Sequence, residues 1–199
     1  MIRKLRDPLL LASIVLQAEV SFAASDLAVD LALLYLDQGQ VTESDSGTKT
    51  SQGTVDTYLH GGVCYFISGD ACLGIKYVSK EKEIETSVES SNASAESVDK
   101  QQWSGLGLSV GYRYNQVNVR ASYLIDGQYE RATTSYFGGP AYMLEAGYGF
   151  KVNSAMIGPM LSYGKFSYTK TKVGSVETEL ANELSDEWVI PSIAVWLLL

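Results

Sequence analysis

The chain has 199 residues, enough for one domain, and its 46% hydrophobic residues, 19% charged residues and mean hydropathy of zero are ordinary for a soluble protein. These averages do not exclude a membrane β-barrel, because apolar and polar residues that alternate along a strand cancel in any average. The net charge of −8 argues against a nucleic-acid partner, since phosphate binding needs a concentrated basic surface.

The N-terminus has the three parts of a cleavable secretory signal. Three basic residues lie within the first six, an apolar run follows at Leu9–Leu16, and "SFA" (Ser21–Ala23) has the small–x–small pattern that signal peptidase cuts. The apolar run is too short for a membrane-spanning helix, which needs about 20 residues. We therefore expect a signal peptide at residues 1–23 and one mature domain at residues 24–199.

The mature region alternates apolar and polar residues in segments that are rich in Val, Ile and Tyr and bounded by Gly, Asn and Asp. This pattern predicts an all-β fold. The eight expected strands are approximately Asp26–Asp37, Thr54–Ile67, Ala71–Ser79, Trp103–Tyr114, Val117–Asp126, Ala141–Val152, Met156–Tyr168 and Glu187–Leu199.

The expected connections alternate in length. Tight turns are expected at Ser68–Asp70, Asn115–Gln116 and Asn153–Ala155, and long polar loops at Gln38–Gly53, Lys80–Gln102, Gly127–Pro140 and Thr169–Asp186. Within the second loop, Glu81–Lys100 is Ser-rich and acidic, so we expect it to be mobile. Short turns at one end and long loops at the other are typical of an antiparallel up-and-down transmembrane β-barrel.

The aromatic residues on the apolar faces of these strands fall into two rows. The row near the turns is Tyr65, Tyr112, Tyr114, Tyr148 and Phe150, and the row near the loops is Tyr35, Tyr77, Tyr123, Tyr142 and Tyr163. Aliphatic residues separate the rows. Tyrosine suits a membrane interface, because its ring tolerates acyl chains while its hydroxyl reaches water. The pattern therefore predicts two aromatic girdles on a lipid-facing surface.

The opposite, inward face is small or charged. Its glycines would leave room for long side chains from other strands, because an eight-stranded barrel is just wide enough for side chains to fill. Asp30, Lys76, Arg120 and Glu145 fall at similar heights on this face, and enclosed charges must be paired or hydrogen-bonded. We expect a lumenal ion-pair cluster that plugs the interior, with a polar gate as the alternative. Trp188 and Trp196 also fall on the inward face, which suggests a bulge or a change of phase in the last strand.

Cys64 and Cys72 flank the first turn on the inward face. Two cysteines in a secreted chain usually pair, because the periplasm is oxidising. A register with Phe66 opposite Asp70 would place the cysteines directly across from each other, and a slip by one pair would prevent the bond. The sequence leaves both registers open. No ligand pattern surrounds the cysteines, so we expect no metal and no other cofactor.

His60 is the only histidine, so any histidine-dependent chemistry must use it. In "YLHGGV", Gly62 stands two residues after His60, where a deacylase-like pair would have Ser. Asp56 shares its face but lies one strand period too far for a direct hydrogen bond. Because nucleophilic catalysis needs a nucleophile and a base within hydrogen-bond reach, we expect no enzymatic activity and a lumenal hydrogen-bonding role for His60.

The chain resembles the small eight-stranded outer-membrane β-barrel proteins of the OmpA/OmpX-like kind. The segments that carry the resemblance are "GLSVGYRYN" (Gly107–Asn115), "VRASYL" (Val119–Leu124) and "IGPMLSYGKF" (Ile157–Phe166). Members of that family usually end in an aromatic residue that the assembly machinery recognises, whereas this chain ends in Leu199.

The resemblance implies a protein of the Gram-negative outer membrane, in contact with outer-membrane lipid, lipopolysaccharide and the barrel-assembly machinery. It implies a structural role or surface interactions through four external loops. The alternatives are a narrow pore, an outer-membrane lipid-modifying enzyme and a soluble periplasmic barrel that binds a small ligand.

Overall fold

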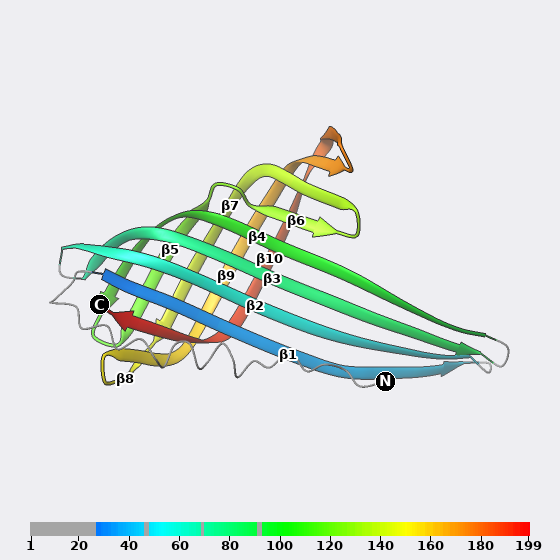
Figure 1. The fold of residues 1–199 in the computed structure, drawn as a ribbon, viewed down its shortest axis with the longest axis horizontal. Coiled ribbons are helices and arrows are strands. Elements are labelled where there is room, and N and C mark those ends of the chain that lie inside the picture. Colours follow the sequence, from blue (N-terminus) through cyan, green and yellow to red (C-terminus); the bar gives the residue numbers. More distant parts are fainter. Residues whose placement is uncertain (1–26, 46–47, 69, 91–92) are drawn as a thin grey trace.

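The computed structural model describes residues 27–45, 48–68, 70–90 and 93–199, and these residues form one antiparallel all-β sheet (Figure 1). The predicted signal peptide, residues 1–23, lies outside the described residues. The strands are β1 (Leu27–Asp45), β2 (Thr48–Ser68), β3 (Ala71–Ser90), β4 (Ala93–Tyr114), β5 (Val117–Leu124), β6 (Gln128–Arg131), β7 (Thr134–Tyr148), β8 (Phe150–Val152), β9 (Ala155–Val173) and β10 (Val176–Leu198).

Eight of these strands close into a ring. Each pairs with its neighbour in the order β1–β2–β3–β4–β5–β7–β9–β10, and β10 pairs back to β1. The short strands β6 and β8 extend this ring at its edges. We call the interior of the ring the lumen.

The ring closes with a stagger. We start at Asp30 on β1 and step from each residue to its register partner on the next strand around the ring. This path ends at Asp186 on β10. The direct partner of Asp30 across the β1–β10 seam is instead Trp196, ten residues further along. Such a stagger requires the strands to tilt, by about 35–45° in closed sheets. The interior of an eight-stranded ring is then just wide enough for side chains to fill.

The seam between β1 and β10 is short. It extends from the pair Ala28–Leu198 to the pair Leu33–Ile193. Two residues before Ile193, β10 contains Pro191, which has no N–H to donate to a neighbouring strand. Beyond Leu33, β2 is the one described strand that pairs with β1, and β1 and β10 diverge (Figure 1).

The prediction of four long loops is wrong for most of their length, because the strands continue through them. The β1–β2 hairpin reaches the pair Asp45–Thr48, and β3–β4 reaches Ser90–Ala93, so Glu81–Lys100 consists largely of paired strands rather than the expected mobile loop. The third range holds β6 with the start of β7, and the fourth holds the end of β9 and the start of β10. A strand that continues an existing hydrogen-bonded strand pair can bond its backbone groups to its neighbour without burying apolar side chains. The polar sequence of these segments therefore gave no sign of a strand.

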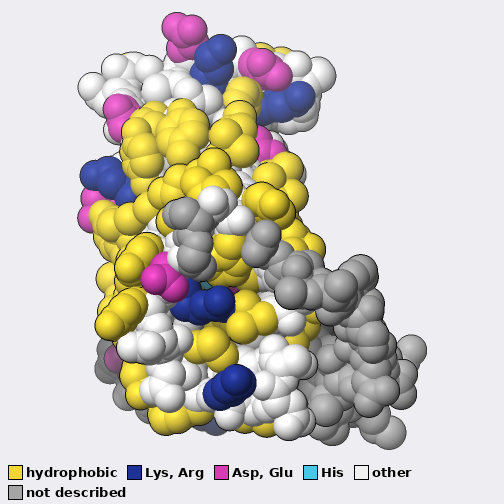
Figure 2. Space-filling model, turned by 90° about the vertical axis from the view of Figure 1, so that its left-hand side faces the viewer, with side chains coloured by type: hydrophobic (Ala, Val, Ile, Leu, Met, Phe, Trp, Pro, Cys, Tyr) yellow, Lys and Arg dark blue, Asp and Glu magenta, His cyan; other side chains and the backbone are white. Residues whose placement is uncertain are grey.

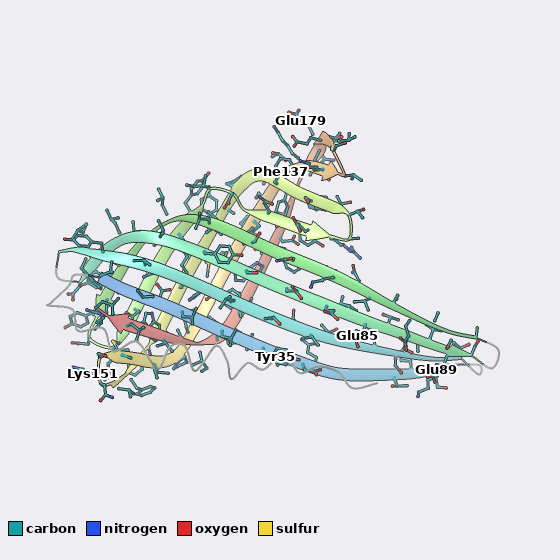
Figure 3. All side chains as sticks on the ribbon, in the orientation of Figure 1. Tyr35, Glu85, Glu89, Phe137, Lys151 and Glu179 are labelled. Carbon is teal, nitrogen blue, oxygen red and sulfur yellow. A yellow bond between two sulfur atoms is a disulfide. The ribbon has the colours of Figure 1, made fainter. Side chains whose placement is uncertain are left out.

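The extended hairpins β1–β2 and β3–β4 form a four-stranded sheet that projects beyond the ring, toward the right in Figure 1. We define this projecting sheet as residues 36–45, 48–56, 81–90 and 93–101. Figure 3 shows Glu85 and Glu89 along it, far from Lys151 at the opposite, turn end of the molecule.

The outward face of the ring is apolar and exposed. Nine of the ten predicted girdle residues are exposed, and Tyr163 is half-buried. Between the two rows lie exposed aliphatic side chains from different strands, among them Leu73, Ile75, Leu106, Leu108, Val110, Val119, Leu144, Leu161 and Ile193. Figure 2 looks onto the turn end and shows hydrophobic side chains around much of its margin.

The lumenal tryptophans pack against glycines. Trp188 and Trp196 are both buried, and the β9–β10 register runs without a shift from Leu184 to Leu197, so the expectation of a bulge or phase change there is wrong. A Cβ added to Gly164 would lie 2.3 Å from the Trp188 ring, and one added to Gly147 would lie 2.7 Å from the Trp196 ring. The glycines on β9 and β7 therefore provide the space that lets two indoles point inward.

Candidate functional site

The lumen contains a cluster of five ionisable side chains. Asp30 (β1), His60 (β2), Lys76 (β3), Arg120 (β5) and Glu145 (β7) meet there, and we call them the lumenal charge cluster. Strand alternation turns each of them inward, and the closed ring brings them together. The structure thus joins all four of the charged residues that the sequence placed at one level, and it adds His60.

Lys76 lies at the centre of the cluster. Its Nζ is 2.6 Å from Asp30 Oδ2 and 2.9 Å from Glu145 Oε2, and only 1% of the residue is exposed. Asp30 also accepts a hydrogen bond from Arg120. Two carboxylates and two basic side chains therefore face one another inside the ring, as burial of charge requires.

His60 connects the two carboxylates. Its Nδ1 is 2.6 Å from Glu145 Oε1 and 3.0 Å from the Tyr58 hydroxyl, while Nε2 is 3.5 Å from Asp30 Oδ2. A contact between histidine and a carboxylate also occurs in catalytic sites, but His60 is completely buried. Asp56, the acid that the sequence placed on the same face, contacts Gln38 through a 3.4 Å hydrogen bond. The sequence indicated a lumenal position for His60, because it falls among the inward-facing residues of the second expected strand.

An aromatic group fills the lumen on the loop side of the cluster. Tyr58, Trp103, Tyr129, Phe166, Tyr168 and Trp188 form one buried group, which we call the aromatic plug. Trp103 and Tyr129 stack with their ring centroids 4.9 Å apart, and Lys80 Nζ lies 4.1 Å from the Trp103 centroid. On the turn side, Met156, Met160 and Trp196 pack together. The lumenal charge cluster therefore lies between two packed layers.

The two cysteines form a disulfide, with Cα atoms 5.6 Å apart. The register differs from the one that would set them directly opposite: Cys64 faces Gly74 and Cys72 faces Phe66. The expectation that a slip by one pair prevents the bond is wrong. The two residues are diagonal neighbours, and the side of Cys64 toward β3 is open because Gly74 has no side chain.

The projecting sheet has an acidic composition and two edges that pair with no further strand among the described residues. Its ranges contain ten Asp or Glu residues and three Lys residues. Among the described strands, β3 alone pairs with the end of β4 between Ala93 and Lys100, and β2 alone pairs with β1 beyond Leu33. Unpaired edges of this kind present backbone donors and acceptors to an incoming strand.

Where the projecting sheet meets the ring, a salt bridge ties β4 to β6. Arg131 Nη2 is 2.9 Å from Asp99 Oδ2, and Gln101 Nε2 donates to the same oxygen at 2.9 Å. These hydrogen bonds lower the pKa of Asp99 below its ordinary value. Because the pKa is lower in the folded protein, the bridge stabilises β6 above the ordinary titration range of aspartate and is lost as the pH falls through the lowered pKa.

We expect Arg131→Gln to move the pKa of Asp99 back toward its ordinary value, measured by ¹³C NMR of the carboxyl group. Amide exchange in β6 should then be faster than in the wild type at neutral pH. The control is Lys49→Gln, which removes the partner of Glu89 at the other end of the projecting sheet and should leave Asp99 unchanged. Equal Asp99 titrations in the wild type and Arg131→Gln would contradict the assignment.

Within the described ranges there is no group of three or more His, Cys, Asp or Glu residues that could hold a metal ion. The same residues contain no helix long and apolar enough to cross a membrane. No family model matches the chain, and no curated protein matches it.

Proposed function

We propose that the chain is an integral protein of the Gram-negative outer membrane, an eight-stranded β-barrel with a filled lumen that acts in surface interactions. The observation that carries the proposal is the outward face of the ring, where aliphatic side chains are exposed between two rows of tyrosines. Soluble monomers rarely expose a contiguous apolar patch larger than a few hundred Å². A lipid bilayer covers such a belt, and the tyrosine rows suit its two interfaces.

The orientation follows from the ends of the ring. The tight turns at Asn115–Gln116 and Asn153–Ser154 would face the periplasm, and the projecting sheet would extend into the medium. Its polar, acidic surface suits water, and its unpaired edges suit a partner that adds a strand. We therefore assign surface interaction to the projecting sheet and a structural role to the ring.

The filled lumen favours a closed barrel over a pore. The lumenal charge cluster lies between the aromatic plug and the Met–Trp layer, and the cavity beside it measures about 30 Å³. That volume accommodates one or two water molecules, not a continuous water column. The alternative of a gate would require the ion pairs around Lys76 to separate. Complete burial of His60 likewise disfavours a lipid-modifying enzyme.

Cell fractionation with a heat-modifiability gel tests the membrane assignment. We expect the protein in the detergent-extracted outer-membrane fraction, with a change of mobility after boiling because intact barrels resist unfolding in detergent. Release from the envelope without detergent, or unchanged mobility, would overturn the assignment. Steady conductance in a planar bilayer would instead favour the pore.

A variant that replaces the two projecting hairpins by tight turns tests the surface role. It should keep heat-modifiable mobility and lose protein contacts made by the cell surface, measured by crosslinking on intact cells. The matched control shortens the β9–β10 hairpin at Val173–Val176 and should retain those contacts.

A further inference from the structure

The outer side of β4 in the projecting sheet is an open pairing position, and we call Ala93–Lys100 the β4 edge. Along it, β3 is the one described strand that pairs with β4, and β6 pairs with β4 only from Gln101 onward (Figure 1). All residues of the β4 edge except Asp99 are exposed. At about 3.3 Å per residue, the β4 edge is about 25 Å long, which is enough for a further strand of ordinary length.

The alternation of the backbone shows which groups of the β4 edge point away from β3. In an antiparallel sheet, successive residues of a strand bond to opposite neighbours. Leu106 faces away from β3, because its carbonyl accepts a hydrogen bond from the N–H of Ile125. The register between β3 and β4 has no shift, so every second residue from Leu106 has the same direction. Ser94, Glu96 and Val98 therefore direct their N–H and C=O groups to the open side.

The β4 edge lacks two features that commonly prevent strand addition. Natural sheets protect their edges with proline and with β-bulges, among other means. The sequence of the β4 edge contains no proline, and its register with β3 is regular. The opposite edge of the projecting sheet, on β1, has an irregularity between Asp37 and Gln40. Of the two edges, β4 is therefore the one better suited to accept a strand.

Charge selects among the partners that this edge could accept. The outward face of β2, β3 and β4 in the projecting sheet carries five carboxylates and two lysines: Glu81, Glu83, Glu85, Glu89 and Glu96, with Lys49 and Lys100. Lys49 contacts Glu89, and Lys100 contacts Glu81. Arg131, at the β6 end of the β4 edge, is paired with Asp99. The nearby cations are thus engaged elsewhere than at Glu96.

A hollow on the projecting sheet adjoins the β4 edge. Its volume is about 350 Å³, and its charged lining residues are Lys49, Glu85, Glu89 and Glu96. Three carboxylates and one lysine therefore surround it. A long cationic side chain opposite Glu96 on an added strand would lie beside this hollow.

We propose that the β4 edge binds an extended cationic segment of another protein, which adds antiparallel to β4 and places Lys or Arg beside Glu96. All strand pairs in this sheet are antiparallel. The residue opposite Glu96 then exchanges two backbone hydrogen bonds with it, and the two side chains share one face. A second copy of this chain would instead set another face with the same excess of carboxylates beside the first, and like charges oppose that pairing. The inference rests on the surface role proposed for the projecting sheet, and it adds the edge and the chemistry of the partner.

The probe is a dye-labelled octapeptide of alternating lysine and valine, and fluorescence anisotropy measures its binding to the folded full chain in non-ionic detergent. We expect saturable binding. A lysine opposite Glu96 directs its own N–H to β4, so N-methylation of the lysine amides should weaken binding at least tenfold. N-methylation of the valine amides should leave the affinity within about twofold. These two peptides have the same charge and composition, so they separate backbone pairing from attraction to the acidic face or to detergent.

Two pairs of variants test the protein side. Val98→Pro removes an N–H that points to the open side and should weaken binding at least tenfold, whereas Val98→Ala keeps that donor and should bind as the wild type does. Glu96→Lys should weaken binding at least fivefold. Its matched control is Glu43→Lys, the same change of charge on β1 at the opposite edge, which should have less than a twofold effect.

Amide exchange gives a readout that does not depend on any variant folding. Addition of the octapeptide to the wild type should slow exchange at Ser94, Glu96 and Val98. Absence of saturable binding would overturn the proposal, as would equal affinities within the N-methylated pair or the Val98 pair. Protection of the same amides by self-association without peptide would favour a second copy and also overturn it. The surface role fails separately, if removal of the projecting hairpins leaves the crosslinks on intact cells unchanged.

Discussion

Lys76→Met should lower the free energy of unfolding by about 3–5 kcal/mol, because it leaves Asp30 and Glu145 buried without their shared cation. Methionine keeps most of the side-chain volume, so the loss would report charge rather than packing. Urea unfolding followed by tryptophan fluorescence measures it. The chain carries three tryptophans, and all three lie in β4 or β10.

The control for this change is Lys100→Met, which removes an exposed partner of Glu81 and should cost no more than about 1 kcal/mol. The double variant Lys76→Met with Glu145→Gln restores the charge balance and should recover part of the loss. If Lys76→Met cost no more than Lys100→Met, the cluster would not be the enclosed network described above.

Trp188→Ala should lower the free energy of unfolding by about 3–5 kcal/mol, because the indole fills the lumen beside the aromatic plug residues Tyr58 and Phe166. The ring centroids of Trp188 and Tyr58 are 5.6 Å apart. The matched control is Val189→Ala, the next residue along β10, whose side chain faces outward and is 60% exposed. It should cost much less in detergent. If Val189→Ala lowered the free energy of unfolding more than Trp188→Ala, the side chains of β10 would face the opposite way, as after a register shift of one residue.

The space for Trp188 can be tested from the opposite strand. Gly164→Val should destabilise the protein by about 1–3 kcal/mol, because the added carbon atoms meet the indole ring. Combining Gly164→Val with Trp188→Leu should relieve the clash. A double-mutant cycle would then show a coupling energy, and purely additive effects would contradict the contact.

The alternation of apolar and polar residues in the sequence was sufficient to predict the inward and outward faces of the ring. Alternation with a period of two placed Asp30, Lys76, Arg120 and Glu145 on one face and the tyrosines on the other, and the structure has the same division. Alternation works here because a strand places successive side chains on opposite faces, and a closed sheet turns one face of every strand inward. The inward tryptophans followed the same rule, although their size made the phase look wrong.

Other features depended on contacts between distant segments. The projecting sheet was missed because its strands are stabilised by their neighbours' backbone groups, and a polar sequence carries no sign of that support. The Cys64–Cys72 bond depended on a register that only strand pairing sets. His60 joined the cluster because the closed ring brings β2, β3 and β7 to one lumen.

The sequence by itself determined which face of each strand is apolar, where the tight turns fall and that the interior must hold balanced charge. These are local properties, because alternation and turn chemistry act within a few residues. The tertiary structure alone decided the stagger of the closed ring, the central position of Lys76 and the reach of the hairpins beyond the ring. Each of these depends on which strands meet and in what register, and no short stretch of sequence encodes that.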